Sequence, residues 1–120
     1  MLERSVANSD QKEFWNDIKG QLWVDMQPRI DEMLRPFGEK TLAALGPKSG
    51  EKVLEIGCGT GTMTMMLAEH VTPFGEIVAV DISNPMLKLA RSRTNSLIPD
   101  GPVFIEGDAQ VHNFPTGYFD

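Results

Sequence analysis

The sequence of 120 residues is poor in cysteine and contains no long apolar run. Cys58 is the only cysteine, so no disulfide can form within one chain. No stretch approaches the roughly 20 apolar residues that a membrane-spanning helix needs. Residues 1–10 carry charge and lack the apolar segment of a secretory signal. We therefore expect a cytoplasmic protein with no membrane partner.

Basic side chains and histidines are also scarce. The chain has 11 Lys and Arg residues against 17 Asp and Glu residues, which gives a formal net charge of −6. Binding to a nucleic-acid backbone relies on clustered Lys and Arg, so no nucleic-acid partner is expected. His70 and His112 are the only histidines and are isolated in the sequence. The sequence shows no metal-ligand spacing, and no metal site is expected.

The apolar pattern of the N-terminal part predicts helices. Residues 1 to about 12 are polar and are expected to be frayed. Apolar residues at helical spacing predict two short helices over 14–34, interrupted at Gly20 and Pro28. A further helix is predicted over about 38–45, so the first part of the chain is expected to be entirely helical.

Three short apolar runs in the rest of the chain predict strands, and helical spacing of apolar residues follows the first two. A strand that is apolar on both faces suits a parallel sheet covered by helices. Right-handed crossovers would place the second strand beside the first and the third outside it, in the order 3-2-1. A turn is expected at 98–102, and a fourth strand is expected to begin at 118–120. The three predicted strands are 52–56, 77–81 and 103–106.

Three glycines at alternate positions, Gly57, Gly59 and Gly61, follow the first predicted strand. They could form a purely structural turn, or they could let a ligand approach the main chain. Ligands of parallel sheets bind at the carboxyl ends of the strands, where Asp81 can accept hydrogen bonds from two ribose hydroxyls. A nucleoside-containing ligand is therefore predicted. The nicotinamide pattern G-x-G-x-x-G is not completed, because position 62 is threonine.

The pattern from residue 55 to residue 61 is E-x-G-x-G-x-G. VLEIGCGTG, VAVDIS with PML after it, and FIEGDA followed by FP and YFD stand in this order in the sequence. In these motifs the chain resembles the class I S-adenosylmethionine-dependent methyltransferases, most closely the small-molecule branch called methyltransferase type 11 or UbiE-like. The resemblance covers residues 50–120. It implies a Rossmann-like α/β fold, S-adenosylmethionine as the cofactor and a small-molecule methyl acceptor.

The resemblance also implies a cofactor site at the carboxyl ends of the strands. The glycine loop would pass under the methionine and ribose parts of the cofactor, with Cys58 as a small residue rather than a reactive thiol. Glu55 would orient that loop or reach the amino group through water. Asp81 would hold the ribose hydroxyls, and Ile82 and Met86 would pack on the adenine faces. The implied cofactor-binding residues are Glu55, Gly57, Cys58, Gly59, Gly61, Asp81, Ile82, Met86, Asp108 and Ala109.

The edge of the adenine and a lid are implied as well. Asp108 would accept a hydrogen bond from the exocyclic amine, and the Ala109 N–H would meet a ring nitrogen. The N-terminal helices would cover the site, through Trp23 and Gln27. Methyl transfer from a sulfonium requires no protein nucleophile, and catalytic residues are left unassigned.

The resemblance further implies that the chain holds only the cofactor-binding half of a seven-stranded fold. We expect an N-terminal helical cap over 1–46 and a truncated Rossmann-like half-domain over 47–120. The half-domain alone is expected to be inactive. It is also expected to self-associate, most simply as a homodimer, through the sheet edge left open beside 52–56.

Two classes of function stay open at this point. One is a methyltransferase, and the other is a non-catalytic module that binds a nucleoside or a partner. Simpler interpretations also apply to single side chains, because Trp15 and Trp23 are typical packing anchors. The acidic residues at 31–32 and the basic pair Arg91 and Arg93 are typical of solvated helix faces.

Overall fold

The structure is a computed structural model that describes residues 8–94 and 101–120. Residues 1–7 and most of the turn expected at 98–102 therefore lie outside the described residues. Three initial helices are followed by strands and helices in alternation. The helices are α1 (Ser9–Asn16), α2 (Ile18–Asp25), α3 (Gln27–Leu45), α4 (Thr62–Val71) and α5 (Asn84–Thr94). The strands are β1 (Lys52–Ile56), β2 (Glu76–Asp81) and β3 (Val103–Glu106).

The three strands form one parallel sheet in the order β1-β2-β3. Glu55 of β1 lies opposite Ala79 of β2, and Ala79 lies opposite Phe104 of β3. The carboxyl ends of all three strands therefore meet at the same edge of the sheet. The predicted α/β fold class, strand order and parallel direction are confirmed.

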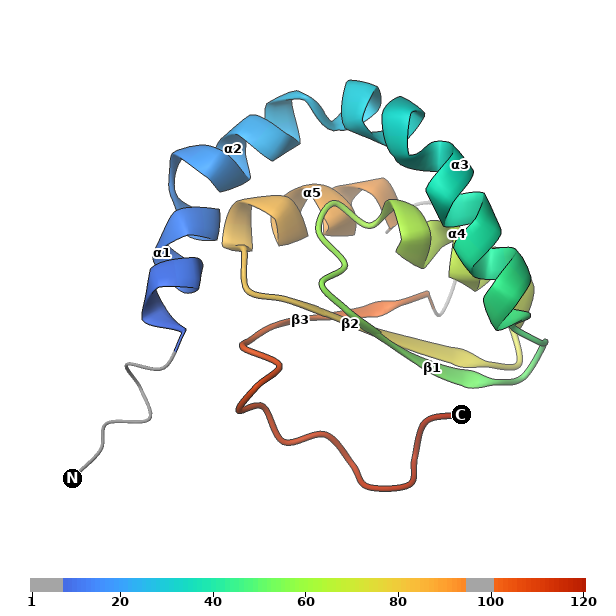
Figure 1. The fold of residues 1–120 in the computed structure, drawn as a ribbon. Helices are drawn as coiled ribbons and strands as arrows, with labels where there is room; N and C mark the ends of the chain where they lie inside the picture. The colour runs from blue at the N-terminus through green and yellow to red at the C-terminus, as the bar shows by residue number, and fades with distance from the viewer. Residues whose placement is uncertain (1–7, 95–100) are drawn as a thin grey trace.

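The helices of the described residues all lie on one face of the sheet (Figure 1). Helix α4 connects β1 to β2, helix α5 connects β2 to β3, and helices α1 to α3 arch over this pair. Both connections step across the sheet in the same direction. Because such crossovers are right-handed, they place both helices on the same face.

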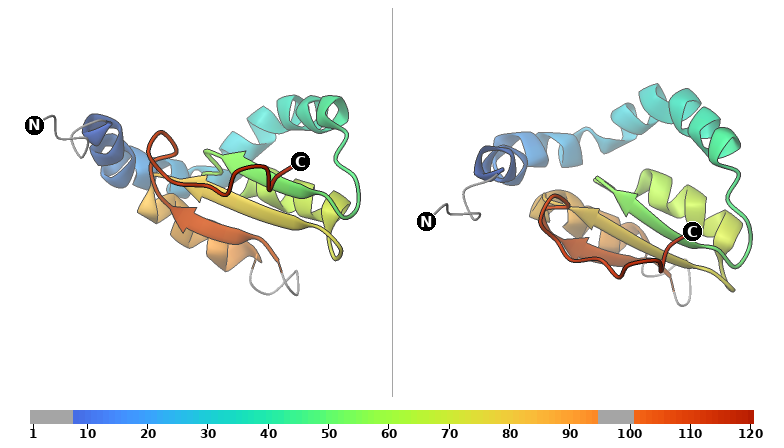
Figure 2. Two further views of the ribbon diagram at one scale, coloured as in Figure 1. Left: turned by 90° about the horizontal axis from the view of Figure 1, so that it is seen from below. Right: turned by 60° about the horizontal axis from the view of Figure 1, so that its bottom comes forward.

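The face opposite the helices is apolar and only partly covered. Residues 107–120 run along it as an irregular segment (Figure 2). Successive strand residues point to opposite faces, and Val53 and Ile77 belong to the helix-covered core. Ile56 of β1 and Val103 of β3 therefore point away from the helices, and they are 63% and 56% exposed. This face is a surface on which further protein could pack.

Within the described residues, the hydrophobic core has two clusters between the sheet and its helices. One cluster joins the end of α3 to α4 and β2, and its buried members are Leu42, Leu67, Ala68, Val71 and Ile77. The second joins the glycine loop to β2 and α5, and it contains Cys58, Ala79 and Leu87, with Phe104 packed against it. The second cluster fixes the base of the glycine loop, because Cys58 belongs to that loop.

The first two helices differ from the prediction in their boundaries. Residues 9–12 belong to α1, so the prediction that this stretch is frayed is wrong. The first break falls at Asp17, not at Gly20. Gly20 is buried inside α2, where a Cβ atom would lie 1.9 Å from the Trp15 carbonyl oxygen. The glycine allows α1 and α2 to approach closely and does not end a helix.

Helix α3 is one helix where two were predicted. It begins after Met26 with Pro28 in its first turn, where the missing N–H of proline costs no hydrogen bond. Pro36 lies inside the helix and removes a single backbone hydrogen bond. The separate helix predicted over 38–45 is therefore wrong. The helix ends at Gly46, whose φ of 59° is in the left-handed region that favours glycine.

No strand forms at 118–120, so the fourth strand predicted to begin there is wrong. The Asp120 N–H donates to the Lys52 carbonyl oxygen at 2.8 Å. The Lys52 N–H donates in turn to Asp120 Oδ2, also at 2.8 Å. In a sheet, the Lys52 N–H would donate to a backbone carbonyl oxygen of a neighbouring strand, and here it donates to the Asp120 side chain. The segment therefore reaches the edge of β1 without extending the sheet.

Candidate functional site

The loop between β1 and α4 makes three left-handed turns in five residues. Gly57, Gly59 and Gly61 have φ angles of 79°, 55° and 88°, which other residue types rarely adopt. The N–H groups of Gly57 and Cys58 both donate to the Val80 carbonyl oxygen, at 2.8 and 3.2 Å. The backbone conformation alone thus explains the three glycines, and the loop is tied to the end of β2.

Asp81 holds this loop from the end of the neighbouring strand. Its Oδ2 atom accepts the Gly59 N–H at 2.8 Å, and its Oδ1 atom accepts the Ser83 N–H at 2.8 Å. Each carboxylate oxygen can accept a second hydrogen bond. Asp81 therefore anchors the loop and keeps one acceptor position on each oxygen for a ligand.

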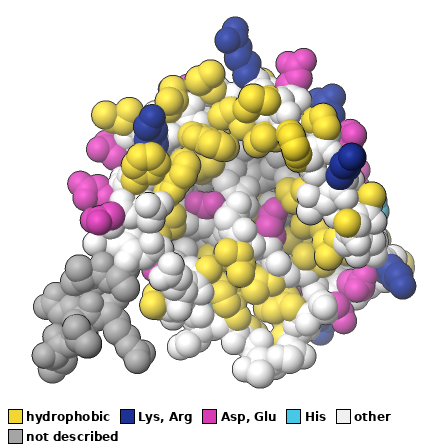
Figure 3. Space-filling model, viewed as in Figure 1, with side chains coloured by type: hydrophobic (Ala, Val, Ile, Leu, Met, Phe, Trp, Pro, Cys, Tyr) yellow, Lys and Arg dark blue, Asp and Glu magenta, His cyan; other side chains and the backbone are white. Residues whose placement is uncertain are grey.

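A cavity of about 650 Å³ lies between the helical arch and the carboxyl ends of the strands. Figure 3 shows this hollow, with hydrophobic side chains around its rim and acidic side chains inside it. Eight of the ten predicted cofactor-binding residues line it, together with both predicted lid residues. The predicted residues on its wall are Trp23, Gln27, Gly57, Cys58, Gly59, Asp81, Ile82, Met86, Asp108 and Ala109.

The loop after β3 closes one side of the cavity. The Gly107 N–H donates to the Asp81 carbonyl oxygen at 3.0 Å, which places Asp108 beside the end of β2. Asp108 Oδ1 accepts the Gln110 N–H at 2.9 Å. The carboxylate is thereby oriented by its own loop, and its second oxygen is not used in that bond.

Glu55 and Gly61 are the two predicted residues that do not line the cavity. Glu55 lies under α4, where its carboxylate accepts the Thr64 hydroxyl. Burial raises the pKa of Glu55; the Thr64 bond opposes this shift, and the nearby Asp81 charge adds to it. Gly61 is buried, and a Cβ atom there would lie 3.0 Å from the Ala90 Cβ. Both residues hold α4 in place beside the site.

Cys58 lines the cavity, but its side chain belongs to the core cluster with Ala79 and Leu87, and its thiol is not activated. Burial, together with the negative charges of Glu55 and Asp81, raises the pKa of Cys58 to about 12, with a backbone hydrogen bond and Arg91 opposing. A thiol is nucleophilic as its thiolate. Cys58 is therefore protonated at neutral pH and acts as a small apolar residue in the loop.

Sequence reasoning missed most of the wall that the arch provides. Trp15 lies on the cavity next to Trp23, with ring centroids 5.7 Å apart in an edge-to-face pair. Ile30 and Leu34 of α3 also line the cavity. Their apolar spacing reveals that they are helical, but only the tertiary arrangement reveals that this side of the helix faces a cavity.

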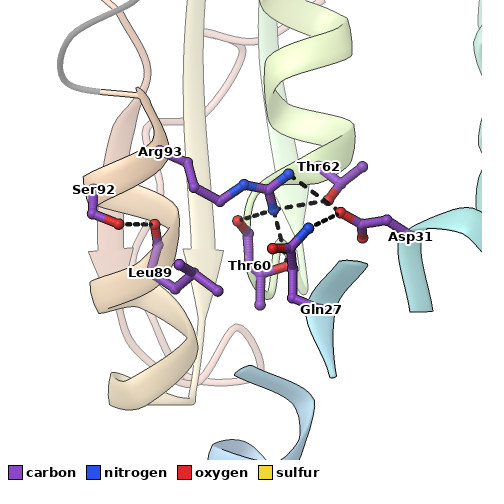
Figure 4. Close-up of polar contacts among 7 residues, drawn as sticks. All are labelled: Gln27, Asp31, Thr60, Thr62, Leu89, Ser92 and Arg93. Atoms are coloured by element: carbon purple, nitrogen blue, oxygen red, sulfur yellow. Dashed lines mark hydrogen bonds and ion pairs between the residues drawn. The ribbon is translucent and has the colours of Figure 1, made fainter. Parts of the chain in front are cut away.

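Arg93 and Asp31 are not on solvated helix faces, so that prediction is wrong for both. Their side chains are 19% and 20% exposed and form an ion pair, with Nη2 and Oδ2 separated by 3.2 Å. Arg91 is also engaged, because its Nη2 donates to the Phe104 carbonyl oxygen at 3.2 Å. Figure 4 shows Arg93 reaching from α5 to the glycine loop and to α3.

The described residues contain no metal cluster. Over 8–94 and 101–120, no three His, Cys, Asp or Glu side chains come together in a way that could hold a metal ion. His70 bonds to the Met66 carbonyl oxygen and His112 packs on Phe114. Within the same ranges, no helix has both the length and the apolar composition needed to cross a membrane.

Comparison with known proteins agrees with this geometry. The family described as "Methyltransferase domain" matches residues 53–120, which include β1, the glycine loop, Asp81 and the loop after β3. The chain belongs to this methyltransferase family. Within it, the chain is a class I, UbiE-like member, and the cofactor of the family is S-adenosylmethionine.

Curated relatives carry the same assignment. The chain is 33% identical over 81 residues to the demethylmenaquinone methyltransferase of Lactococcus lactis subsp. lactis (strain IL1403), covering 68% of this chain and 32% of the relative. It is 40% identical over 81 residues to the ubiquinone/menaquinone biosynthesis C-methyltransferase UbiE of Ectopseudomonas mendocina (strain ymp), covering 67% and 32%. The chain thus spans about a third of the length of these relatives.

Solved structures of methyltransferases share the fold. A phosphoethanolamine N-methyltransferase 2 of Haemonchus contortus, in complex with phosphomonomethylethanolamine and S-adenosylhomocysteine, aligns with a TM-score of 0.63 at 27% identity. The alignment covers 71% of this chain and 20% of that one. A SAM-dependent methyltransferase from Aquifex aeolicus aligns with a TM-score of 0.61 at 26% identity, covering 69% and 44%.

Proposed function

We propose that this chain binds S-adenosylmethionine in the cavity between the arch and the sheet, and supplies the cofactor-binding part of a methyltransferase that acts on a small molecule. The observation that carries the proposal is Asp81. It faces the cavity with an acceptor position left on each oxygen, and it anchors the glycine loop through Gly59.

The lining of the cavity fits this cofactor. Its volume of about 650 Å³ is within the usual range for small-ligand sites, which is roughly 300–1,000 Å³. A Cβ atom on Gly57 would meet nothing within 4 Å, so the main chain there is open to a ligand. Polar acceptors and apolar surfaces are both present, as a nucleoside with an amino-acid chain requires.

Each part of the cofactor has a candidate partner. Asp81 would accept from the two ribose hydroxyls, and Ile82 and Met86 would pack against the adenine. Asp108 would accept from the exocyclic amine, and the Ala109 N–H would donate to a ring nitrogen. The backbone of the glycine loop, including Cys58, would lie under the methionine and ribose parts. Glu55 and Gly61 would act indirectly, by fixing the loop and α4.

In methyl transfer, the main task of the protein is to position the two reactants. When bound, the cofactor supplies a methyl group on a sulfonium, which is a good leaving group. The chain's own residues would orient that group and keep water out, and such positioning contributes strongly to catalysis. We propose that residues 1–46 form the cap over the site, with Trp23 and Gln27 as lid residues, and that residues 47–120 form the cofactor-binding half-domain.

The acceptor is proposed to be a small molecule, by analogy with relatives whose names state methylation in quinone biosynthesis. The matched segment is about a third of those relatives, so we propose that acceptor contacts and any general base lie outside the segment of similarity. On this proposal the chain alone binds the cofactor and does not turn over. Binding without any turnover, even in the presence of the complementing part, would favour a non-catalytic module.

Self-association of these 120 residues is part of the proposal. Among the described residues, the backbone groups at the outer edge of β1 form hydrogen bonds only with Asp120, and the sheet face opposite the helices exposes Ile56 and Val103. Pairing of two β1 edges around a two-fold axis would satisfy the backbone groups of the open edge. Sedimentation at micromolar concentration should show a dimer, and a monodisperse monomer would refute this association.

Calorimetric titration with S-adenosylhomocysteine, beside NAD and ATP, tests the proposed function. The proposal expects one site that binds S-adenosylhomocysteine and discriminates against the other two nucleotides. Binding of NAD or ATP with equal affinity would point to a general nucleoside module. Binding of none of the three would reject the cofactor site.

A further inference from the structure

Arg93 makes the densest set of polar contacts around the glycine loop. Its Nη1 atom donates to the Thr60 carbonyl oxygen at 2.9 Å, to Thr60 Oγ1 at 3.3 Å and to Thr62 Oγ1 at 3.0 Å. Thr60 is in the loop and Thr62 begins α4. One guanidinium nitrogen, Nη1, therefore holds both the glycine loop and the start of α4.

The other nitrogen reaches the helical arch. Arg93 Nη2 pairs with Asp31 Oδ2 of α3 at 3.2 Å, across 62 positions of sequence. The same Asp31 oxygen accepts the side-chain amide of Gln27, one turn earlier on α3. A carboxylate only accepts hydrogen bonds, so Gln27 must present its nitrogen to Asp31. The Gln27 carbonyl oxygen accepts no hydrogen bond from residues 8–94 or 101–120 and can serve as an acceptor.

The residues that Arg93 touches lie on the cavity, although Arg93 does not. Thr60 and Thr62 form part of its floor, and Gln27 and Asp31 form part of the wall that α3 contributes. The planar fork of a guanidinium can hold two groups in a fixed relative position, which a lysine ammonium cannot do in the same way. Arg93 therefore sets the distance between floor and wall.

We propose that Arg93 is a positioning residue for the cofactor, which fixes the glycine loop and helix α3 against each other through Thr60, Thr62 and Asp31. This inference rests on the proposed function, since its consequence is for cofactor affinity. Through Asp31, Arg93 also fixes the side-chain amide of Gln27. The carbonyl oxygen of that amide is an acceptor suited to an ammonium group, such as that of an amino-acid ligand.

Arg91 provides a matched control. It stands two positions earlier on the same helix, and its contact is one hydrogen bond to the Phe104 carbonyl oxygen of β3. Arg93→Met and Arg91→Met remove the same side chain from the same helix. If both arginines only stabilise the fold, the two variants should change amide exchange and cofactor affinity alike. If Arg93 positions the cofactor site, only Arg93→Met should change them.

Two measurements are made on the full 120-residue chain. The first is amide hydrogen exchange of residues 57–62 and 27–34 without ligand. The second is the dissociation constant for S-adenosylhomocysteine. Arg93→Met should accelerate exchange in both segments and weaken binding by about tenfold or more, the loss expected when charged hydrogen bonds that preorganise a site are removed. Arg91→Met should leave both readouts within about twofold of the wild type.

Two milder variants separate the arms and guard against misfolding. Asp31→Asn should loosen 27–34 and leave 57–62 protected, because the bonds from Arg93 to Thr60 and Thr62 remain. Arg93→Lys should give an intermediate affinity, since it keeps the charge and loses the fork. If Arg93→Met does not fold, amide exchange and S-adenosylhomocysteine affinity of Asp31→Asn and Arg93→Lys test the positioning role in its place.

The outcomes distinguish this inference from the proposed function. If the wild type binds S-adenosylhomocysteine and Arg93→Met matches Arg91→Met in affinity and exchange, the positioning role is wrong. If the wild type does not bind, the proposed function fails, and exchange alone decides whether Arg93 joins the loop to α3. Faster exchange in both segments then supports that link, and unchanged exchange refutes it.

Discussion

The helical arch and the sheet with its two helices are held by different forces. Helices α4 and α5 each bury four residues, whereas α1 buries none, α2 only Gly20 and α3 only Leu42. The arch leaves large apolar side chains such as Phe14, Ile18 and Phe37 exposed. The sheet unit is therefore stabilised by apolar burial, and the arch has little of it.

Apart from the apolar cluster around Leu42, polar contacts connect the arch to the sheet unit. The Asn16 amide donates to the Ile82 carbonyl oxygen at 2.7 Å and accepts the Asn84 N–H at 2.8 Å. The Ser83 hydroxyl donates to the Trp15 carbonyl oxygen at 2.6 Å. These contacts all meet the turn after Asp81. Elements with few buried contacts unfold locally first. The arch buries fewer residues than the sheet unit, so the sheet unit should form a rigid floor for the site and the arch a wall that can open.

The largest effect is expected from the core of the sheet unit. Leu87 of α5 is fully buried, and Leu87→Ala should lower the free energy of unfolding by about 2–5 kcal/mol. Leu22 of α2 is 41% exposed, and Leu22→Ala should cost less than about 1 kcal/mol. Urea denaturation of both variants measures the contrast. Equal losses would mean that the arch is as tightly packed as the sheet.

The next effect concerns the floor of the site. Asp81→Ala removes acceptors for the ribose, and hydrogen bonds to charged groups contribute about 1.5–3 kcal/mol each, so affinity for S-adenosylhomocysteine should fall at least about tenfold. Asp25→Ala is the control, because Asp25 is exposed and bonds to Gln21 on its own helix. Titration calorimetry of the two variants gives the answer, and an unchanged constant for Asp81→Ala would reject the assignment.

A smaller effect is expected where the arch is attached. Asn16→Ala removes both bonds to the turn after Asp81, each with a net contribution of about 1 kcal/mol. Amide exchange over 9–25 should accelerate while that of 77–81 stays slow. Gln21→Ala is the control, since the Gln21 side-chain amide bonds to Asp25 within the arch. Equal acceleration in arch and sheet would contradict the division between them.

The smallest effect is a pH dependence from Glu55. Burial raises its pKa above the ordinary value of 4.5, so the folded protein keeps this proton to a higher pH than the unfolded chain. The contribution of Glu55 to stability is then complete below pH 4.5 and is lost as the pH rises through the raised pKa. Glu55→Gln should therefore gain stability relative to the wild type as the pH rises above that value.

Thermal unfolding from pH 4 to pH 8 tests this expectation. Glu69→Gln serves as the control, because Glu69 is an exposed residue of α4. A difference between wild type and Glu55→Gln that does not change with pH would show that Glu55 is not held in its protonated form by burial.

The parts predicted well are those that the sequence encodes locally. The strands at 52–56 and 103–106 have the predicted bounds, because short apolar runs between turn residues leave few alternatives. Asp81 and the glycine loop come together because parallel strands end at one edge of a sheet. Three alternating glycines were not in themselves evidence of a ligand, since each has a left-handed φ that the turn requires.

The parts predicted poorly depend on contacts between distant segments. Gly20 suggested a helix break, but it marks the approach of α1 to α2 at the Trp15 carbonyl. Arg93 and Asp31 each occupy polar positions typical of a solvated helix face, and their pairing across 62 positions leaves no local signal. The apolar spacing predicts that the arch is helical, whereas its placement over the site was implied only by the family resemblance.

Chemical-shift mapping by NMR with S-adenosylhomocysteine tests the central claim most directly. If the cofactor lies between the arch and the floor, amide shifts should change at 57–59, 81–82 and 108–109, and at Gln27 across the cavity. Amides at 52–54, at the opposite end of β1, should not move. Changes centred on the uncovered sheet face or on 118–120, or no changes at saturating ligand, would contradict the assignment of this cavity as the cofactor site.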